Sequence, residues 1–259
     1  MKTELVTVLI PIHLEEPTPL EKISLSQTLR VLHNYPITFM APEDLNTVWY
    51  EKFCKNKAVI QFERFRWKGI EQFGVLQSTP QFYERFLKYE FMLICHLDSF
   101  VFRDELEKWC SLDYDFIGSV IYNTGFQIKN TLLRKMTRFT NPEYFGAAGF
   151  GLKKTRGYHY MTTRFKPYID FYHWQRKIRK RAFYDDLFYT QHFPKLSSNF
   201  KISPRHLAEK FGADFNQWDV DKLPFDQAVD SSLPFGVHAW IQYNLDYWKP
   251  CIRRYGYDL

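Results

Sequence analysis

The sequence predicts an α/β fold with a mostly parallel central sheet. Residues 6–12 form a β-branched run closed by proline, and residues 37–40 form a second short apolar run. Between them, apolar positions at Ile23, Leu25, Leu29 and Leu32 follow a helical period. A strand, a helix and a strand in succession are typical of parallel strand pairing.

Further apolar runs predict more strands, at 58–62, 89–95 and 114–120. Helices are expected from Ser78, as N-cap with Pro80 in the first turn, at 105–110 and around 184–193. Residues 123–143 are polar and irregular, which indicates a mobile loop. No linker or internal repeat interrupts the chain, so we expect one domain over 1–259.

The composition indicates a soluble globular protein but does not identify its binding partner. Of the 259 residues, 45% are hydrophobic and 25% charged, as in soluble globular proteins. The 19% aromatic content fits either core packing or a stacking site for sugars or bases. A net charge of +6 suits phosphates, nucleic acid or an anionic membrane surface.

The cysteines and the N-terminus predict a reducing compartment. The four cysteines show neither metal-finger spacing nor a C-x-x-C pair, so we expect free thiols at Cys54, Cys95, Cys110 and Cys251. The first apolar stretch is short and lacks a cleavage site, which favours a strand over a signal peptide. No run reaches the ~18 apolar residues of a membrane span.

A histidine and an aspartate follow the most apolar run, 89–95. His96 and Asp98 are two residues apart, so on a strand they would point to the same side. Ligands of open α/β sheets bind beyond the carboxyl ends of the strands. A ligand-binding role is therefore one interpretation. The other is that Asp98 caps the helix near 103–105 or pairs with a local arginine.

Three more short patterns are candidates for chemistry. Small residues at Gly146, Ala147, Ala148 and Gly149 allow a ligand to approach the backbone, or allow tight packing. Asp185 and Asp186 either cap a helix or supply a general base. His238, within PFGVHAW, is either a core residue or a metal ligand.

The stretch from Arg164 to Arg181 is strongly basic. Phe171, Trp174 and Ile178 recur on one side of the predicted helix, and arginines and lysines crowd the others. Such a helix either lies on an anionic membrane surface or presents a solvated face.

The order of these patterns resembles the bacterial glycosyltransferase-like family labelled "domain of unknown function 5672". LDSFVF, DFIGS, G-x-x-G-F-x-L-K, SPRHLAEKF and PFGVHAW carry the resemblance, which spans most of the chain from Val6 to about Trp240. It implies a GT-A-like, Rossmann-type α/β/α sandwich, distantly similar to Fringe-type inverting transferases. A nucleotide-binding half over 1–122 and an acceptor and catalytic half over 123–259 would follow.

The resemblance also implies roles for residues. Asp98 matches the metal-binding aspartate of an Asp-x-Asp motif, and His96 stands where its first aspartate is expected. His238 matches the histidine that completes the metal site, and Asp186, beside Asp185, matches the base. The remaining matches form two groups: nucleotide contacts at Pro11, Ile12, His13 and Ser99, and substrate contacts at Gly146, Ala147, Ala148, Gly149 and Trp240.

The implied activity is a glycosyltransferase acting in bacterial surface polysaccharide synthesis. It would take a UDP-, GDP- or TDP-linked sugar, use Mn²⁺ or Mg²⁺, and transfer to a glycan or lipid-linked acceptor with inversion. We expect a cytoplasmic protein, peripheral on the inner face of the membrane, that does not bind nucleic acid. Retention of configuration and phosphotransfer remain open. So does an inactive nucleotide-sugar-binding module, because His96 and the two alanines depart from the family pattern.

Overall fold

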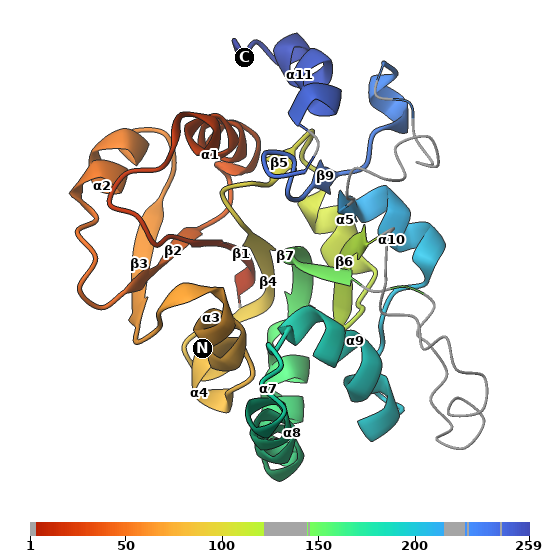
Figure 1. The fold of residues 1–259 in the computed structure, drawn as a ribbon. Helices are drawn as coiled ribbons and strands as arrows, with labels where there is room; N and C mark the ends of the chain where they lie inside the picture. Colours follow the sequence, from red (N-terminus) through yellow and green to blue (C-terminus); the bar gives the residue numbers. More distant parts are fainter. Residues whose placement is uncertain (1–3, 122–143, 145, 215–225, 227, 244) are drawn as a thin grey trace.

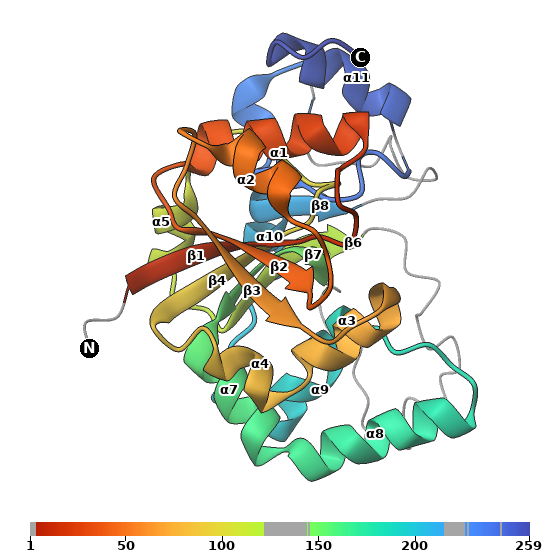
Figure 2. The same ribbon diagram turned by 90° about the vertical axis from the view of Figure 1, so that its left-hand side faces the viewer.

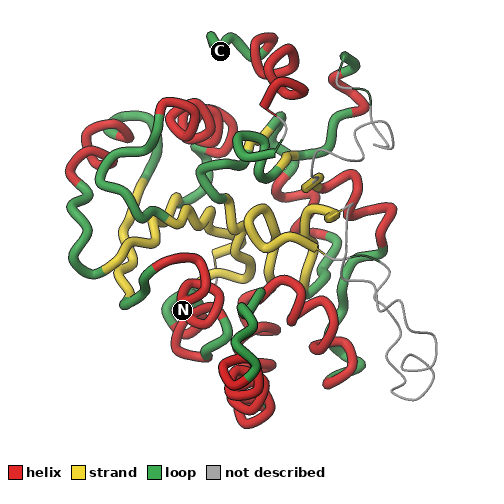
Figure 3. Tube along the Cα trace, in the orientation of Figure 1, coloured by secondary structure: helices red, strands yellow, loops and turns green. Residues whose placement is uncertain are grey.

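A computed structural model describes residues 4–121, 144, 146–214, 226, 228–243 and 245–259. Their strands form one sheet of nine, in the order β3-β2-β1-β4-β7-β6-β8-β9-β5 (Figure 1). The strands are β1 Glu4–Pro11, β2 Ile37–Pro42, β3 Ile60–Phe65, β4 Tyr89–Cys95, β5 Phe100–Val101, β6 Phe116–Ile121, β7 Gly146–Lys154, β8 Gly212–Asp214 and β9 Gly236–Val237. Helices cover both faces (Figure 3).

The first four strands of the sheet order are parallel. β1 pairs with β2 on one side and β4 on the other, and β2 pairs with β3. Val8 and Leu93 at the centre are fully buried, as expected for strands covered on both faces. Beyond β4, strand β7 is antiparallel to both of its neighbours, and β6, β8 and β9 run parallel to one another. The predicted sandwich with a mostly parallel sheet is confirmed.

One face of the sheet packs against α1 Pro19–Leu32, α2 Val48–Cys54, α5 Leu106–Ser111 and α10 Arg205–Phe211. The predicted helix after the first strand is therefore confirmed as α1. It starts with a capping box, in which the Thr18 hydroxyl accepts from the Glu21 backbone and Glu21 accepts from Thr18 N.

The opposite face packs against α3 Gly69–Gln77, α4 Pro80–Glu84, α7 Thr155–Arg164, α8 Lys166–Ile178 and α9 Asp185–Leu196. A smaller cluster at the end of the sheet joins β5 and β9 to α11 Leu245–Arg254. The short η2 turn, Asp230–Ser232, precedes β9. Figure 2 shows α8 along the lower edge of the molecule, with α3 and α9 above it.

One local prediction, the N-cap of the helix that contains Pro80, is wrong. Thr79, and not Ser78, is the N-cap residue of α4; the Ser78 hydroxyl instead donates to Val75 O at the end of α3. The small-residue segment is part of the strand β7, because the backbone of Gly146–Lys154 is extended and pairs on both sides.

The other predictions on chain organisation are partly testable. All four cysteines are buried free thiols. The proposed loop 123–143 lies outside the described residues, and the division at 122/123 stays a prediction. In the described part of the chain, no helix combines the length and apolar character that a membrane crossing needs.

Candidate metal and donor site

His96 and Asp98 lie at the carboxyl end of the central strand β4. His96 N donates to Gly149 O at 2.8 Å, which continues the pairing with β7 for one more residue. The chain then turns, with Ser99 N donating to His96 O at 2.9 Å and the Ser99 hydroxyl to Gly149 O at 3.2 Å. The turn fixes both side chains at the sheet edge where ligands of α/β proteins bind.

His238 meets this pair from the other end of the chain. It follows β9, and its backbone N–H donates to Ala213 O at 2.9 Å. Its Nε2 lies 3.3 Å from Asp98 Oδ1, and its Nδ1 lies 2.7 Å from Asp214 Oδ2. The next residue, Ala239, has a left-handed φ of 57°, a conformation that non-glycine residues seldom adopt.

The three side chains offer a ligand set for a metal ion. One ligand atom each from His96, Asp98 and His238 lie within 4.8 Å of one another. Nε2 of His96 and Nε2 of His238 are buried and lack a hydrogen-bond partner in the described part of the chain. Buried imidazole nitrogens normally have partners. Two imidazoles and one carboxylate this close together fit a divalent cation, so these residues match the metal ion that the family resemblance implies.

Asp214 was not predicted from the sequence, yet it sets the orientation of His238. A carboxylate on one ring nitrogen fixes the tautomer and leaves the other nitrogen's lone pair free for a metal. Asp214 lies in the three-residue strand β8, which no sequence pattern predicted. Its contact with His238 depends on the pairing of β8 with β9.

The protonation states of the three residues follow from burial and mutual charge. Burial, helped by the charge of His238, lowers the pKa of His96 to about 4, so His96 is neutral. Burial alone would raise the pKa of Asp98, but the charge of His238 holds it well below its usual range. Burial opposes protonation of His238, and the carboxylates of Asp98 and Asp214 outweigh it and raise its pKa. The same two carboxylates would favour a metal cation in place of that proton.

Gly149 is required for this arrangement. A β-carbon at this position would lie 2.0 Å from His238 Nε2. The His238 ring therefore lies directly over the β7 backbone, beside the end of β4. The small-residue pattern thus serves side-chain packing at this position, one of the two interpretations that the sequence left open.

Asp185 and Asp186 occupy the first turn of α9, as the sequence predicted. Asp186 Oδ1 accepts from Leu187 N at 2.7 Å. Burial, followed by the charge of Asp185, raises the pKa of Asp186 to about 7. The charge of Asp214 also raises the pKa of Asp186, whereas a backbone hydrogen bond from Ala148 of β7 lowers it.

Asp185 faces a buried lysine that sequence reasoning missed. Lys153 is fully buried; its Nζ donates to Gln77 Oε1 at 2.8 Å and lies 3.8 Å from Asp185 Oδ2. Gln77 Nε2 in turn donates to Asp185 Oδ2 at 3.2 Å. Burial lowers the pKa of Lys153 to about 8. This triangle joins α3, β7 and the start of α9. The sequence offers little signal for this lysine, because Lys153 stands beside a second lysine, Lys154, at the end of β7.

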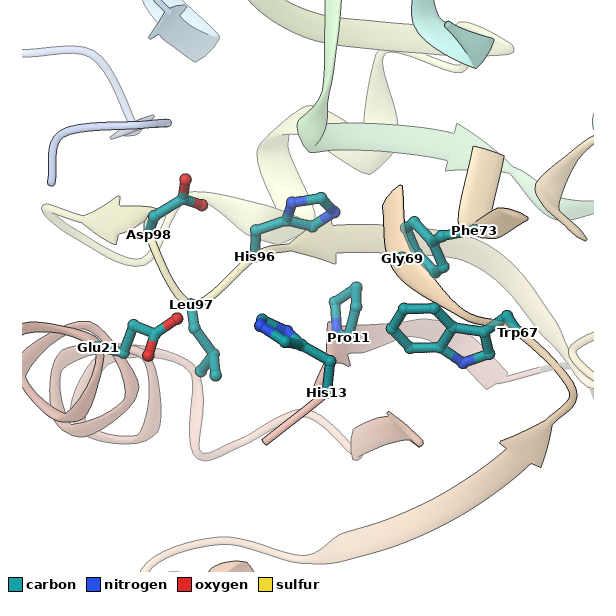
Figure 4. A pocket seen from close by; sticks show the side chains of 9 residues that line it. All are labelled: Pro11, His13, Glu21, Trp67, Gly69, Phe73, His96, Leu97 and Asp98. Carbon is teal, nitrogen blue, oxygen red and sulfur yellow. The ribbon is translucent and has the colours of Figure 1, made fainter. Parts of the chain in front are cut away.

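An aromatic pocket of about 330 Å³ adjoins the cluster. Its lining is Pro11, His13, Glu21, Trp67, Gly69, Phe73, His96, Leu97 and Asp98 (Figure 4). The Trp67 and Phe73 rings are 5.1 Å apart, Phe73 and His96 are 5.7 Å apart, and His96 and His238 are 5.4 Å apart. A row of rings thus leads from the pocket to the metal candidates. Trp67 and Phe73 were missed because single aromatics are common in cores.

The other predicted residues are placed as follows. Pro11 and His13 line the pocket, whereas Ile12 is fully buried in the core. Trp240 is also fully buried, and its indole N–H donates to Ser24 Oγ at 2.9 Å. The structure does not bring Trp240 to the pocket, so we leave it out of the proposed site.

Solved structures that are similar to this fold include glycosyltransferases. The galactosyltransferase LgtC, in complex with donor and acceptor sugar analogs, has a TM-score of 0.58 at 11% identity, over 96% of this chain and 95% of LgtC. Mouse xyloside xylosyltransferase 1 has a TM-score of 0.53 at 12% identity, over 91% and 97%. GlyE of Streptococcus pneumoniae TIGR4 has 0.54 at 12%, over 98% of this chain but 63% of GlyE.

These likenesses define the class of fold: a GT-A-type glycosyltransferase fold, as the sequence predicted. The model of the family described as "Protein of unknown function (DUF5672)" matches residues 56–238, more than two thirds of the chain. The chain therefore belongs to the DUF5672 family. No curated protein matches the sequence.

Proposed function

We propose that this protein transfers a sugar from a nucleotide-diphosphate donor to the hydroxyl of a glycan or lipid-linked acceptor. The observation that carries the proposal is the convergence of His96, Asp98 and His238 at the carboxyl end of β4, beside an aromatic pocket. His96, Asp98 and His238 would hold a divalent cation, and such a cation would offset the negative charge of a diphosphate. The adjoining pocket is suited to a base or ribose.

The donor's nucleoside would occupy the pocket between the ends of β1 and β4, with Pro11 and His13 on one side and Trp67 and Phe73 on another. Aromatic faces attract bases by stacking. The diphosphate would then extend along His96 toward Asp98. When bound, a divalent cation supplies charge neutralisation for the departing diphosphate. Two imidazoles among three ligands favour Mn²⁺ over Mg²⁺.

Asp186 is the proposed general base. A base works best with a pKa near the working pH, and the pKa of Asp186 is raised to about 7. Removing the proton from the acceptor hydroxyl lets its oxygen attack the anomeric carbon as the nucleotide leaves, which inverts the configuration. Asp185 and Lys153 do not reach the acceptor in this scheme; they hold the first turn of α9 in place.

We further propose that the reaction takes place in the cytoplasm, on the inner face of a bacterial membrane, during the synthesis of surface polysaccharide. Nucleotide sugars are cytoplasmic substrates, and four buried free thiols fit a reducing compartment. A lipid-linked acceptor would lie at that surface.

A screen of nucleotide sugars tests the proposal. UDP-, GDP- and TDP-linked sugars are each added with Mn²⁺, and both the thermal midpoint and donor hydrolysis are measured. At least one donor should raise the midpoint and be hydrolysed, and Asp98→Asn should lose both effects while unfolding normally without ligand. Stabilisation without hydrolysis or transfer would instead support a nucleotide-sugar-binding module. If no donor raises the midpoint, the proposed function is wrong.

A further inference from the structure

Helix α8 carries apolar side chains on two sides, and only one of them is used by the fold. Ile169 is buried, and Phe165 and Tyr172 pack against the same core cluster. The other side exposes Phe171, Trp174 and Ile178, which are 52%, 57% and 61% exposed. Figure 2 shows α8 as the outermost element along one edge of the molecule. Three large exposed apolar side chains in a row on such a helix indicate an interaction surface.

The segment that contains α8 has the same net positive charge as the whole protein. Residues 164–181 contain seven lysines and arginines and one aspartate, a net charge of +6, equal to that of the full chain. The rest of the sequence is balanced between acids and bases. Lys166 is paired with Asp170, while Lys177, Arg179, Lys180 and Arg181 are exposed at the end of α8 and just beyond it. The cations thus border the exposed apolar row.

We propose that α8 is a membrane-docking helix, with Phe171, Trp174 and Ile178 inserted between anionic phospholipids. The basic residues around them would contact the lipid phosphates. This deepens the peripheral location proposed above by naming the surface and the lipid chemistry. A helix with an apolar row and a cationic border lies in the plane of the interface, and tryptophan is enriched at that depth.

The shape of the surface favours lipid over nucleic acid. The Phe171 and Trp174 rings stack on each other, with centroids 5.6 Å apart and planes at 26°. Ring faces that cover each other are less available to bases, which need open aromatic faces. Ile178, the most exposed of the three, has no ring for a base to stack on but partitions well into lipid. Nucleic-acid binding is therefore an outcome that the test must exclude.

Docking through α8 would place the lipid surface near α9, the helix that carries the proposed base Asp186. The chain from Ile178 reaches Asp185, the first residue of α9, within seven residues. The Phe183 ring in this connection packs against His173 of α8 at 4.2 Å. His173 Nε2 also lies 2.8 Å from Ser78 Oγ, beyond α3. The helix is thus tied to the elements that hold Asp186, which suits an acceptor presented by a lipid.

Vesicle sedimentation of the full chain tests the docking surface without using the transfer reaction. Phosphatidylcholine vesicles with and without phosphatidylglycerol are compared at low salt. The wild-type protein should sediment with the anionic vesicles only. Lys177→Glu, Arg179→Glu and Arg181→Glu together should weaken binding roughly 100-fold, because each cation near the surface contributes about fivefold. The matched control, Lys52→Glu with Lys55→Glu and Lys57→Glu, should bind like the wild type.

The apolar row is tested separately. Phe171→Ser with Trp174→Ser should weaken vesicle binding by roughly tenfold or more, since both side chains would be buried in lipid. Val48→Ser with Val59→Ser, also exposed apolar positions, is the control. Equal binding of the apolar variant and the wild type, equal binding to vesicles without phosphatidylglycerol, or binding to single-stranded RNA in place of vesicles would each overturn the inference. Transfer to a water-soluble acceptor should not change in this variant, so the docking surface and the proposed activity can fail independently.

Discussion

His238 is held in place by Asp214: the 2.7 Å contact between His238 Nδ1 and Asp214 Oδ2 leaves Nε2 facing Asp98. The two residues are 24 positions apart and meet because β8 and β9 pair side by side. A carboxylate behind a histidine is the usual support of a metal ligand. Five features of the site therefore lead to measurable expectations.

Loss of the Asp214 support should weaken metal binding without removing a ligand. Asp214→Asn is expected to lower Mn²⁺ affinity about 10- to 100-fold, because the amide no longer fixes the His238 tautomer. Calorimetric titration with Mn²⁺ in the absence of nucleotide measures the effect. Asp230→Asn, an exposed aspartate on η2, is the control. Unchanged affinity in Asp214→Asn would show that His238 is not a ligand.

Both imidazoles should matter for the choice of metal. His96→Asp restores the carboxylate expected from the wider fold, and we expect it to narrow the preference for Mn²⁺ over Mg²⁺, since carboxylates suit both ions. Competition between Mg²⁺ and Mn²⁺, followed by the electron paramagnetic resonance signal of free Mn²⁺, measures the ratio. His206→Asp on α10 is the matched control. A ratio that does not change would place His96 outside the metal site.

Gly149 should not tolerate a side chain. Gly149→Ala places a β-carbon 2.0 Å from His238 Nε2, so the histidine must move away from Asp98. We expect Mn²⁺ affinity to fall roughly tenfold or more even where the protein stays folded. Ala147→Gly, a small-residue change in the same strand, should keep its metal affinity. Comparison of the two variants distinguishes displacement of His238 from a general disruption of β7.

The pH profile of transfer should report Asp186. The base acts when ionised, so the turnover number should rise with pH through about 7 and then level off. Asp185→Asn removes the neighbouring charge that raises the pKa of Asp186, and should shift this rise to lower pH. Asp186→Asn should lower turnover roughly 100-fold or more while donor affinity stays within about threefold. Equal losses in turnover and donor affinity would contradict the assignment.

Burial of Lys153 should make the free energy of unfolding depend on pH. Its pKa is about 8 in the folded protein and 10.5 in the unfolded chain, so between these values the unfolded state binds more protons. Its charge therefore destabilises the folded state below pH 8, and this cost fades as the pH rises toward 10.5. The free energy of unfolding of the wild type minus that of Lys153→Met should rise between pH 8 and 9.5, by about 1 kcal/mol or more. Lys154→Met, at the neighbouring and partly exposed position of β7, is the control.

The local sequence was sufficient for much of the fold and for half of the site. The β-branched run ending at Pro11 and the apolar run ending at Cys95 were predicted as buried strands from their short length and their β-branched and aromatic residues. His96 and Asp98 follow directly from the second run. Asp185 and Asp186 were placed at a helix start for the same reason, since acidic residues before an aromatic run favour a first turn.

The remaining features depended on long-range pairing. Residues 146–154 contain three glycines, which are depleted in strands, and it is pairing with β4 and β6 that makes them a strand. Asp214 lies in a three-residue strand, which is too short to show the hydrophobic alternation that predicts a strand. Lys153 looked like a surface lysine, and its burial became evident only when β7 took a position between β4 and β6.

The sequence by itself therefore determined strands β1, β2, β4 and β6, helix α1, the first turn of α9, the candidate ligands and the basic helix, because these rest on periodicity and charge along the chain. Only the tertiary structure decided that His238 meets Asp98, that Asp214 stands behind it, and that Phe171, Trp174 and Ile178 face outward. A helical row of apolar residues has the same spacing whether it faces the core or solvent. Which side is buried depends on the neighbours that the fold supplies.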